Sequence, residues 1–196
     1  MKKLIILFVL IVAPFYATAI DVGGSLTYGS DYVWRGVSQK GSPALSVGIE
    51  ADHNGLYGGA WASQVDYGDD SDYEYDFYAG YGFDINDELS FDVGVIQYNF
   101  NNEPQNRLEE WYVGGTFKGF TATYWRDFEN SDNHFAEYSY AIPIDGVSLS
   151  VFWQDPNDFY GINISKDLED FTLMASIGQD RDTSNNEAVV SVAYNF

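Results

Sequence analysis

The chain ends in Ala188-Val189-Val190-Ser191-Val192-Ala193-Tyr194-Asn195-Phe196, and this stretch decides the fold that we predict. Four apolar residues in it share one parity, so in a strand they would line one face: Val190, Val192, Tyr194 and Phe196. A strand with such a face suits a closed barrel in lipid, because the last strand pairs with the first and turns its apolar side to the acyl chains. The ending therefore indicates a transmembrane β-barrel.

The same two-sided alternation recurs along the chain. It is clearest at 73–84, where the odd positions are mostly aromatic and the even ones are acidic or glycine with one tyrosine, a pattern that neither a helix nor a doubly buried strand produces. We expect an all-β, antiparallel up-and-down barrel of twelve strands. The expected strands are 22–35, 44–52, 56–66, 73–83, 89–98, 109–117, 120–126, 135–142, 147–153, 159–164, 171–177 and 187–196.

The connections between these segments alternate in length. One set is short and includes His53-Asn54-Gly55, a strong hairpin signal because Asn and Gly tolerate positive φ. The other set is more polar and reaches about seven residues at 36–43 and 101–107. An even strand count brings both termini to one side, with short turns in the periplasm and longer loops outside.

The N-terminus reads as a secretory signal. Lys2 and Lys3 precede an apolar run, and Ala17-Thr18-Ala19 is a small-x-small cleavage site. We therefore assign residues 1–19 to a signal peptide and 20–196 to the barrel, located in the outer membrane of a Gram-negative bacterium. A single transmembrane anchor is the alternative, but the run is short for one.

Composition narrows the possible partners. The formal net charge is −21, which argues against nucleic-acid binding. There is no cysteine, so disulfides and thiolate metal sites are excluded, and we expect neither a cofactor nor a metal. The expected partners are outer-membrane lipid, small solutes or ions, and the barrel-assembly machinery, which we expect to recognise the last strand ending at Phe196.

Aromatic residues near the strand ends resemble the girdles of membrane barrels. We expect Tyr28, Tyr32 and Trp34 to share the lipid face of strand one, and Trp111 to begin strand six. Strand three is ambiguous because both parities carry small residues. We favour an outward set and an inward set there: Tyr57, Trp61 and Val65 outward, with Gln64 and Asp66 inward.

The other parity would then line a water-filled lumen about 24 Å across at the backbone, with a free lane of roughly 8–12 Å. Carboxylates dominate this parity, which predicts a preference for cations. The predicted pore-lining residues are Asp31, Arg35, Glu50, Asp52, Glu74, Asp76, Asp92, Glu110, Glu137 and Glu187. Arg35 opposite an acid would either set up a transverse field or form a salt bridge across the lumen.

Two segments resemble the TorF family of proposed porins. Residues 30–39 match its "SDYxxRGxSQ" segment and residues 55–63 match its "GLYxGxWAS" segment. The resemblance implies an outer-membrane barrel with pore activity, and supplies no substrate and no catalytic residues. It marks Asp31, Arg35, Ser38 and Gln39 as a patch at the outer mouth, with packing of the first external loop as the alternative role.

We therefore expect a porin-like channel for passive diffusion of ions or small solutes. A closed structural barrel is the main alternative: no segment is long enough for a plug domain, but inward Tyr78, Tyr98 and Tyr112 could close the lane. An outer-membrane enzyme is disfavoured, because His53 and His134 are the only histidines and His134 adjoins Ser131 only along one loop. No residue is assigned a catalytic role.

Overall fold

The computed structural model describes residues 19–68, 70–102, 108–181, 183 and 185–196. The predicted signal peptide, apart from Ala19, lies outside the described residues. Within the described part of the chain there is no helix long and apolar enough to cross a bilayer.

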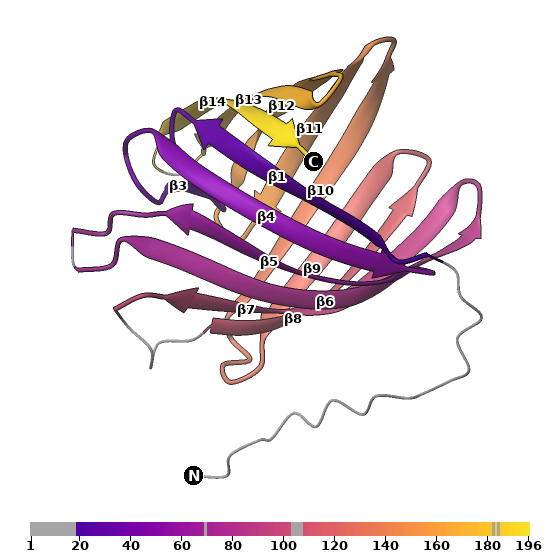
Figure 1. Cartoon of the computed structure of the whole chain (residues 1–196), viewed down its shortest axis with the longest axis horizontal. Helices are drawn as coiled ribbons and strands as arrows, with labels where there is room; N and C mark the ends of the chain where they lie inside the picture. The colour runs from indigo at the N-terminus through magenta and orange to yellow at the C-terminus, as the bar shows by residue number, and fades with distance from the viewer. Residues whose placement is uncertain (1–18, 69, 103–107, 182, 184) are drawn as a thin grey trace.

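Twelve strands form one closed barrel, as predicted (Figure 1). They are β1 (Asp21–Gly29), β4 (Ala44–His53), β5 (Leu56–Gln64), β6 (Tyr73–Asn86), β7 (Leu89–Phe100), β8 (Leu108–Phe117), β9 (Phe120–Asp127), β10 (His134–Ile144), β11 (Val147–Asp155), β12 (Phe159–Leu168), β13 (Phe171–Asp180) and β14 (Asn186–Asn195). A separate hairpin contains β2 (Val33–Trp34) and β3 (Val37–Ser38).

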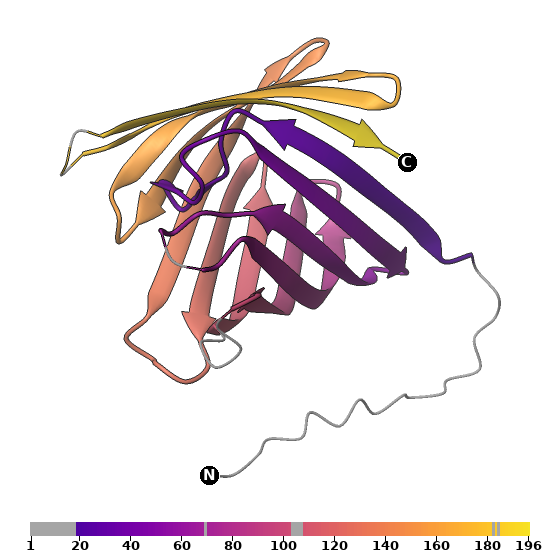
Figure 2. The same ribbon diagram turned by 60° about the vertical axis from the view of Figure 1, so that its left-hand side comes forward.

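The barrel closes between its first and last strands, which lie side by side in Figure 2. β1 and β14 pair antiparallel with Ser25 opposite Asn195. Beyond that pair, Gly24 and Phe196 exchange backbone hydrogen bonds of 2.8 and 3.0 Å. The terminal strand that suggested the fold therefore completes the sheet.

The outer surface of the barrel is apolar along alternate residues of each strand. Val190 on β14 and Phe196 directly after this strand are both 62% exposed. On β6 the exposed set is the odd positions, as predicted: Tyr73, Tyr75, Phe77, Tyr81 and Phe83. Trp111 also lies on this side, since it is opposite the exposed Val95 and packs on Tyr124.

The tight turns have the geometry that their sequences predict. Asn54 and Gly55 have φ of 53° and 84°, and Lys118 and Gly119 have φ of 50° and 82°. Two consecutive positive φ values identify type I′ turns, which match the right-handed twist of the flanking strands. These turns lie at the end of the barrel where β1 begins, and the longer connections lie at the other end.

The expected first strand is wrong beyond Gly29. β1 stops there, and residues 30–43 leave the sheet, form the β2–β3 hairpin and pack inside the barrel. Tyr32 and Trp34 therefore do not share the exposed face of Tyr28: Tyr32 packs on Trp61 and Trp34 on Tyr98, both by edge contacts. The longest connection is consequently longer than the expected seven residues.

The expected orientation of strand three is also wrong. Tyr57 and Trp61 point inward, opposite the inward Asp52 and Gly48, while Leu56 is exposed on the outer face. Gln64 shares the outer parity, and Val65 lies just beyond the strand end, where it is buried. The small residues of β5 occur on both faces of the strand, so its sequence does not show which face is apolar.

Candidate functional site: a loop inside the barrel and the lane beside it

The segment 30–43, called the inner loop from here on, turns sharply at Arg35 and Gly36. Val33 pairs with Ser38 and Trp34 with Val37, so these two residues form the tip of a tight hairpin. Their φ values are 49° and 77°. A Cβ at Gly36 would lie 2.7 Å from the ring of Phe159, so the tip of the hairpin packs closely against the start of β12.

The tip is fixed by an ion pair across the lumen. Arg35 donates from Nη1 to Glu110 Oε1 at 2.9 Å and from Nη2 to Glu110 Oε2 at 2.7 Å. Glu110, on β8, is 0% exposed, and Tyr98 Oη donates to its Oε2 at 3.1 Å. The guanidinium also lies 4.1 Å from the ring centroid of Phe135. Of the two expected roles of Arg35, the structure supports the salt bridge.

Asp31 holds the base of the inner loop. Its Oδ1 accepts from the backbone N–H of Tyr32 at 2.8 Å and of Gly41 at 3.0 Å. Its Oδ2 accepts from the Ser38 hydroxyl at 2.6 Å. Charged acceptors make strong hydrogen bonds, so this carboxylate ties the two ends of the loop together.

Two further contacts join the inner loop to neighbouring connections. Tyr67 Oη donates to Gln39 Oε1 at 2.8 Å, and the Asp66 N–H donates to the Gln39 carbonyl at 2.9 Å. Asn157, between β11 and β12, donates from Nδ2 to the Arg35 carbonyl at 2.9 Å. The loop is therefore anchored on opposite sides of the barrel mouth.

Two predicted pore-lining carboxylates are sealed behind the loop. Glu74 and Asp76, on β6, are 3% and 5% exposed, and among the described residues Glu74 Oε2 and Asp76 Oδ1 have no hydrogen-bond partner. Tyr32 covers them and is hydrogen-bonded to Glu74. Burial, with the nearby charges of Glu74 and Asp76, raises the pKa of the Tyr32 phenol above its usual range, so its hydroxyl remains a donor.

Below the loop, tyrosines lie flat against the wall formed by β5–β8. Tyr57 Oη donates to Asp92 Oδ1 at 2.7 Å and also contacts the hydroxyl of Tyr112. Tyr78 is hydrogen-bonded to Glu50. A Cβ at Gly59 would lie 2.5 Å from the Tyr78 hydroxyl, so the neighbouring strand needs glycine there. Glu50 and Asp92 therefore face inward but are occupied by phenol groups.

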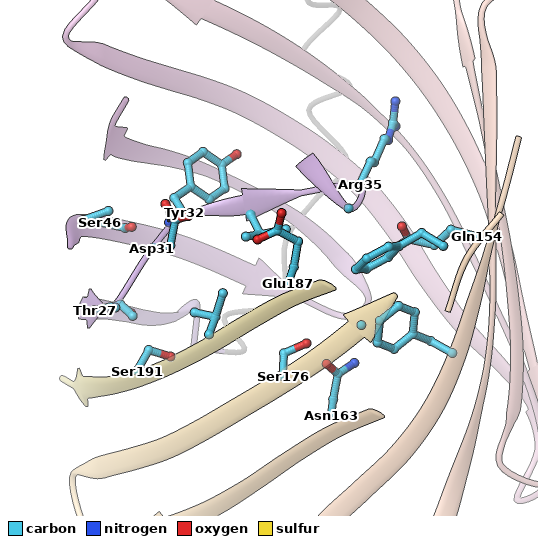
Figure 3. A pocket seen from close by; sticks show the side chains of 18 of the residues that line it. Thr27, Asp31, Tyr32, Arg35, Ser46, Gln154, Asn163, Ser176, Glu187 and Ser191 are labelled. Atoms are coloured by element: carbon cyan, nitrogen blue, oxygen red, sulfur yellow. Dashed lines mark hydrogen bonds between the residues drawn. The ribbon is translucent and has the colours of Figure 1, made fainter. Parts of the chain in front are cut away.

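The opposite half of the barrel is open. Beside the inner loop lies a cavity of about 370 Å³, called the loop cavity from here on, which is shown in Figure 3. Its wall comes mainly from β10–β14 and β1. The acidic residues that line it are Asp31, Glu137 and Glu187. Among the described lining residues the one base is Arg35, whose charge is already matched by Glu110.

The loop cavity continues toward the short-turn end. A second cavity, of about 750 Å³, reaches Lys118 and Gly119 there. The two cavities share four lining residues: Asn163, Ser176, Val189 and Ser191. The two adjoining cavities extend off the barrel axis along β10–β14, from the inner loop to the short-turn end, and are together called the eccentric lane from here on. The remaining predicted acid, Asp52, lines a different cavity with Glu50 near the start of β1.

The predicted acids therefore separate into groups that the sequence did not distinguish. Arg35 and Glu110 bind each other, Glu74 and Asp76 are sealed, and Glu50 and Asp92 hold tyrosines. Asp31, Glu137 and Glu187 lie together at the loop cavity, and the role of the whole set in lining a pore stays a prediction.

Sequence reasoning missed some residues of the loop cavity. Gln154 and Asn163 have the inward parity of their strands, which could have identified them, whereas nothing in the sequence placed Phe159 against Gly36. Neither histidine lines this cavity; His134 stacks on Tyr124 at 6.1 Å between ring centroids, near the exterior Trp111.

A family model described as "Bacterial protein of unknown function (Gcw_chp)" matches residues 16–194. The chain belongs to the Gcw_chp family. No match to a curated protein was found.

Two solved structures with a similar fold have titles that name a porin. This Gcw_chp chain resembles a structure titled "KdgM porin" with a TM-score of 0.66 and 11% identity, over 89% of this chain and 99% of that one. A second, titled "KdgM porin in complex with disordered oligogalacturonate", gives 0.61 and 11% identity, over 91% and 99%. At this identity the likeness is one of fold: a porin-like barrel.

Proposed function

We propose that this protein is an outer-membrane channel through which ions and small polar solutes diffuse passively, with cations favoured. The observation that carries the proposal is the eccentric lane along β10–β14. It begins beside the inner loop, passes Asn163, Ser176 and Ser191, and reaches the short-turn end, where serines and apolar side chains line it together. The apolar outer face suits lipid, since hydrocarbon accepts only backbone that is paired within a closed sheet.

Cation preference follows from the charges beside the loop. Asp31, Glu137 and Glu187 contribute negative charge to the loop cavity, while the positive charge of Arg35 is paired with buried Glu110. A narrow, water-filled passage with fixed negative charge concentrates cations and repels anions. One KdgM porin has been solved with oligogalacturonate, a polyanion. The acidic lane of this chain suits solutes of the opposite charge.

Other observations support a location in the outer membrane. The TorF resemblance falls on the inner loop and β5, and the N-terminal segment reads as a secretory signal. Phe196 is exposed on the outer face beside the β1–β14 closure, and we expect the barrel-assembly machinery to recognise the strand that ends there.

Conductance in planar lipid bilayers tests the proposal. The purified barrel should conduct, and a KCl gradient should give a reversal potential toward that of K⁺. The double variant Glu137→Gln with Glu187→Gln should shift the potential toward zero, whereas Glu129→Gln, on an exposed loop at the same end, should not. A folded barrel that never conducts would instead support a structural role, in which the inner loop and tyrosines close the lumen.

A further inference from the structure

We propose that the loop cavity is a binding subsite for a small organic cation, namely a primary amine attached to an apolar body. This inference rests on the proposed function, since it names the class of solute that would pause in the lane. Three features of the cavity carry it: its charge, an unused acceptor and its aromatic walls.

The charge of the cavity calls for a positive ligand. Glu187, on β14, points into the cavity beside the inner loop (Figure 3), and no described residue bonds or pairs with its carboxylate. Glu137 accepts one hydrogen bond, from Gln154 Nε2 to its Oε2 at 2.7 Å. Among the described residues no three acidic or histidine side chains are grouped to hold a metal ion. Organic N–H donors fit this arrangement better than a bare divalent cation.

Gln154 provides an independent sign of a missing donor. This side chain is 8% exposed and lines the loop cavity. Its amide nitrogen is used by Glu137, but its Oε1 is buried and has no partner among the described residues. Buried carbonyl oxygens are nearly always hydrogen-bonded, by protein, water or ligand. A donor in the cavity would satisfy Gln154 and Glu137 at neighbouring positions.

The walls suit an apolar body next to the cationic group. Phe152 and Phe159, on the side of β11 and β12, are buried with ring centroids 5.7 Å apart. Across the cavity, Tyr32 and Trp61 form an edge contact with their ring centroids 5.0 Å apart. Aromatic faces attract cations and also bury hydrocarbon. The volume of about 370 Å³ lies at the small end of ligand sites, so the ligand is a single small molecule.

Isothermal titration of the detergent-solubilised full chain with benzylamine tests the subsite. Benzylamine should bind, benzyl alcohol and benzoate should bind at least tenfold more weakly, and Glu187→Gln should weaken benzylamine binding about tenfold, the loss expected for one charge-assisted hydrogen bond. Glu137→Gln should act in the same direction. Glu129→Gln serves as the matched control, because it removes an exposed carboxylate outside the cavity at the same end of the barrel.

Several results would overturn the subsite. These are equal binding of benzyl alcohol and benzylamine, no benzylamine binding, or unchanged benzylamine affinity in both folded glutamine variants, with folding checked by far-ultraviolet circular dichroism. The channel and the subsite can fail separately. If benzylamine binds to a barrel that does not conduct, the subsite is supported and the channel is rejected. If the barrel conducts but does not bind benzylamine selectively, the channel is supported and the subsite is rejected.

Discussion

Arg35 at the tip of the inner loop and Glu110 on β8 form a two-bond ion pair inside the barrel, although 75 positions separate them in the sequence. The two ends of the loop join β1 and β4, so this pair connects the strand that closes the barrel with a strand on the other side. It therefore holds the loop across the lumen, beside the cavities that lie along β10–β14.

Replacing Arg35 should release the loop and destabilise the barrel. Arg35→Ala leaves Glu110 buried without a counter-charge, at a cost of about 3–5 kcal/mol in the free energy of unfolding. Single-channel conductance should rise and become noisier. Lys118→Ala, which breaks an exposed pair with Glu88, is the control for stability alone and should change the free energy of unfolding by less than about 1 kcal/mol. Unchanged conductance in a folded Arg35→Ala barrel would show that the loop does not limit the passage.

Asp76→Asn should leave ion selectivity unchanged. Asp76 is sealed behind the inner loop, so its charge does not meet the lane, and its replacement removes a poorly compensated buried carboxylate. The asparagine amide can donate near Glu74, and the free energy of unfolding should rise by about 1–3 kcal/mol. Reversal potentials and urea unfolding measure the two effects. A selectivity loss as large as that of Glu187→Gln would contradict the position assigned to Asp76.

Gly36→Ala and Gly41→Ala separate backbone strain from crowding at the hairpin tip. Both glycines have positive φ, 77° and 68°. An added methyl group at Gly36 meets the Phe159 ring at 2.7 Å, whereas at Gly41 its nearest contact is Ser38 Oγ at 4.0 Å. Gly36→Ala should therefore cost about 1–3 kcal/mol more than Gly41→Ala. Thermal unfolding of the two variants gives the comparison, and equal losses would show that the tip is not tightly packed.

Cation preference should depend strongly on salt. Screening acts over about 10 Å at 0.1 M and about 3 Å at 1 M ionic strength. The reversal potential, corrected for the imposed gradient, should thus show strong selectivity in dilute KCl and little in 1 M KCl. Selectivity that persists at 1 M would indicate a narrow site of direct contact rather than a diffuse acidic field.

Alternation was enough to predict the barrel and its twelve strands, because lipid requires apolar side chains on one face of every strand. It failed where the chain leaves the wall. Tyr28, Tyr32 and Trp34 continue one parity, yet the sheet ends at Gly29, and aromatic residues suit a packed loop as well as a membrane interface.

The candidate site was predicted less completely than the fold. Alternation correctly predicted that Glu110, Glu137 and Glu187 point inward. It carries no information about which side chains each of them contacts inside the barrel. The partner of Arg35 and the covering of Asp76 depend on contacts between distant segments. The parity of β5 was missed because glycine and alanine in its sequence left no contrast between its two faces.

The inner loop also bears on the order of assembly. Its partner Glu110 lies on β8, so the ion pair with Arg35 forms only once the loop and β8 are both in place. A partly assembled barrel without β8 would lack this ion pair, and fixing of the loop across the passage is thereby coupled to completion of the wall.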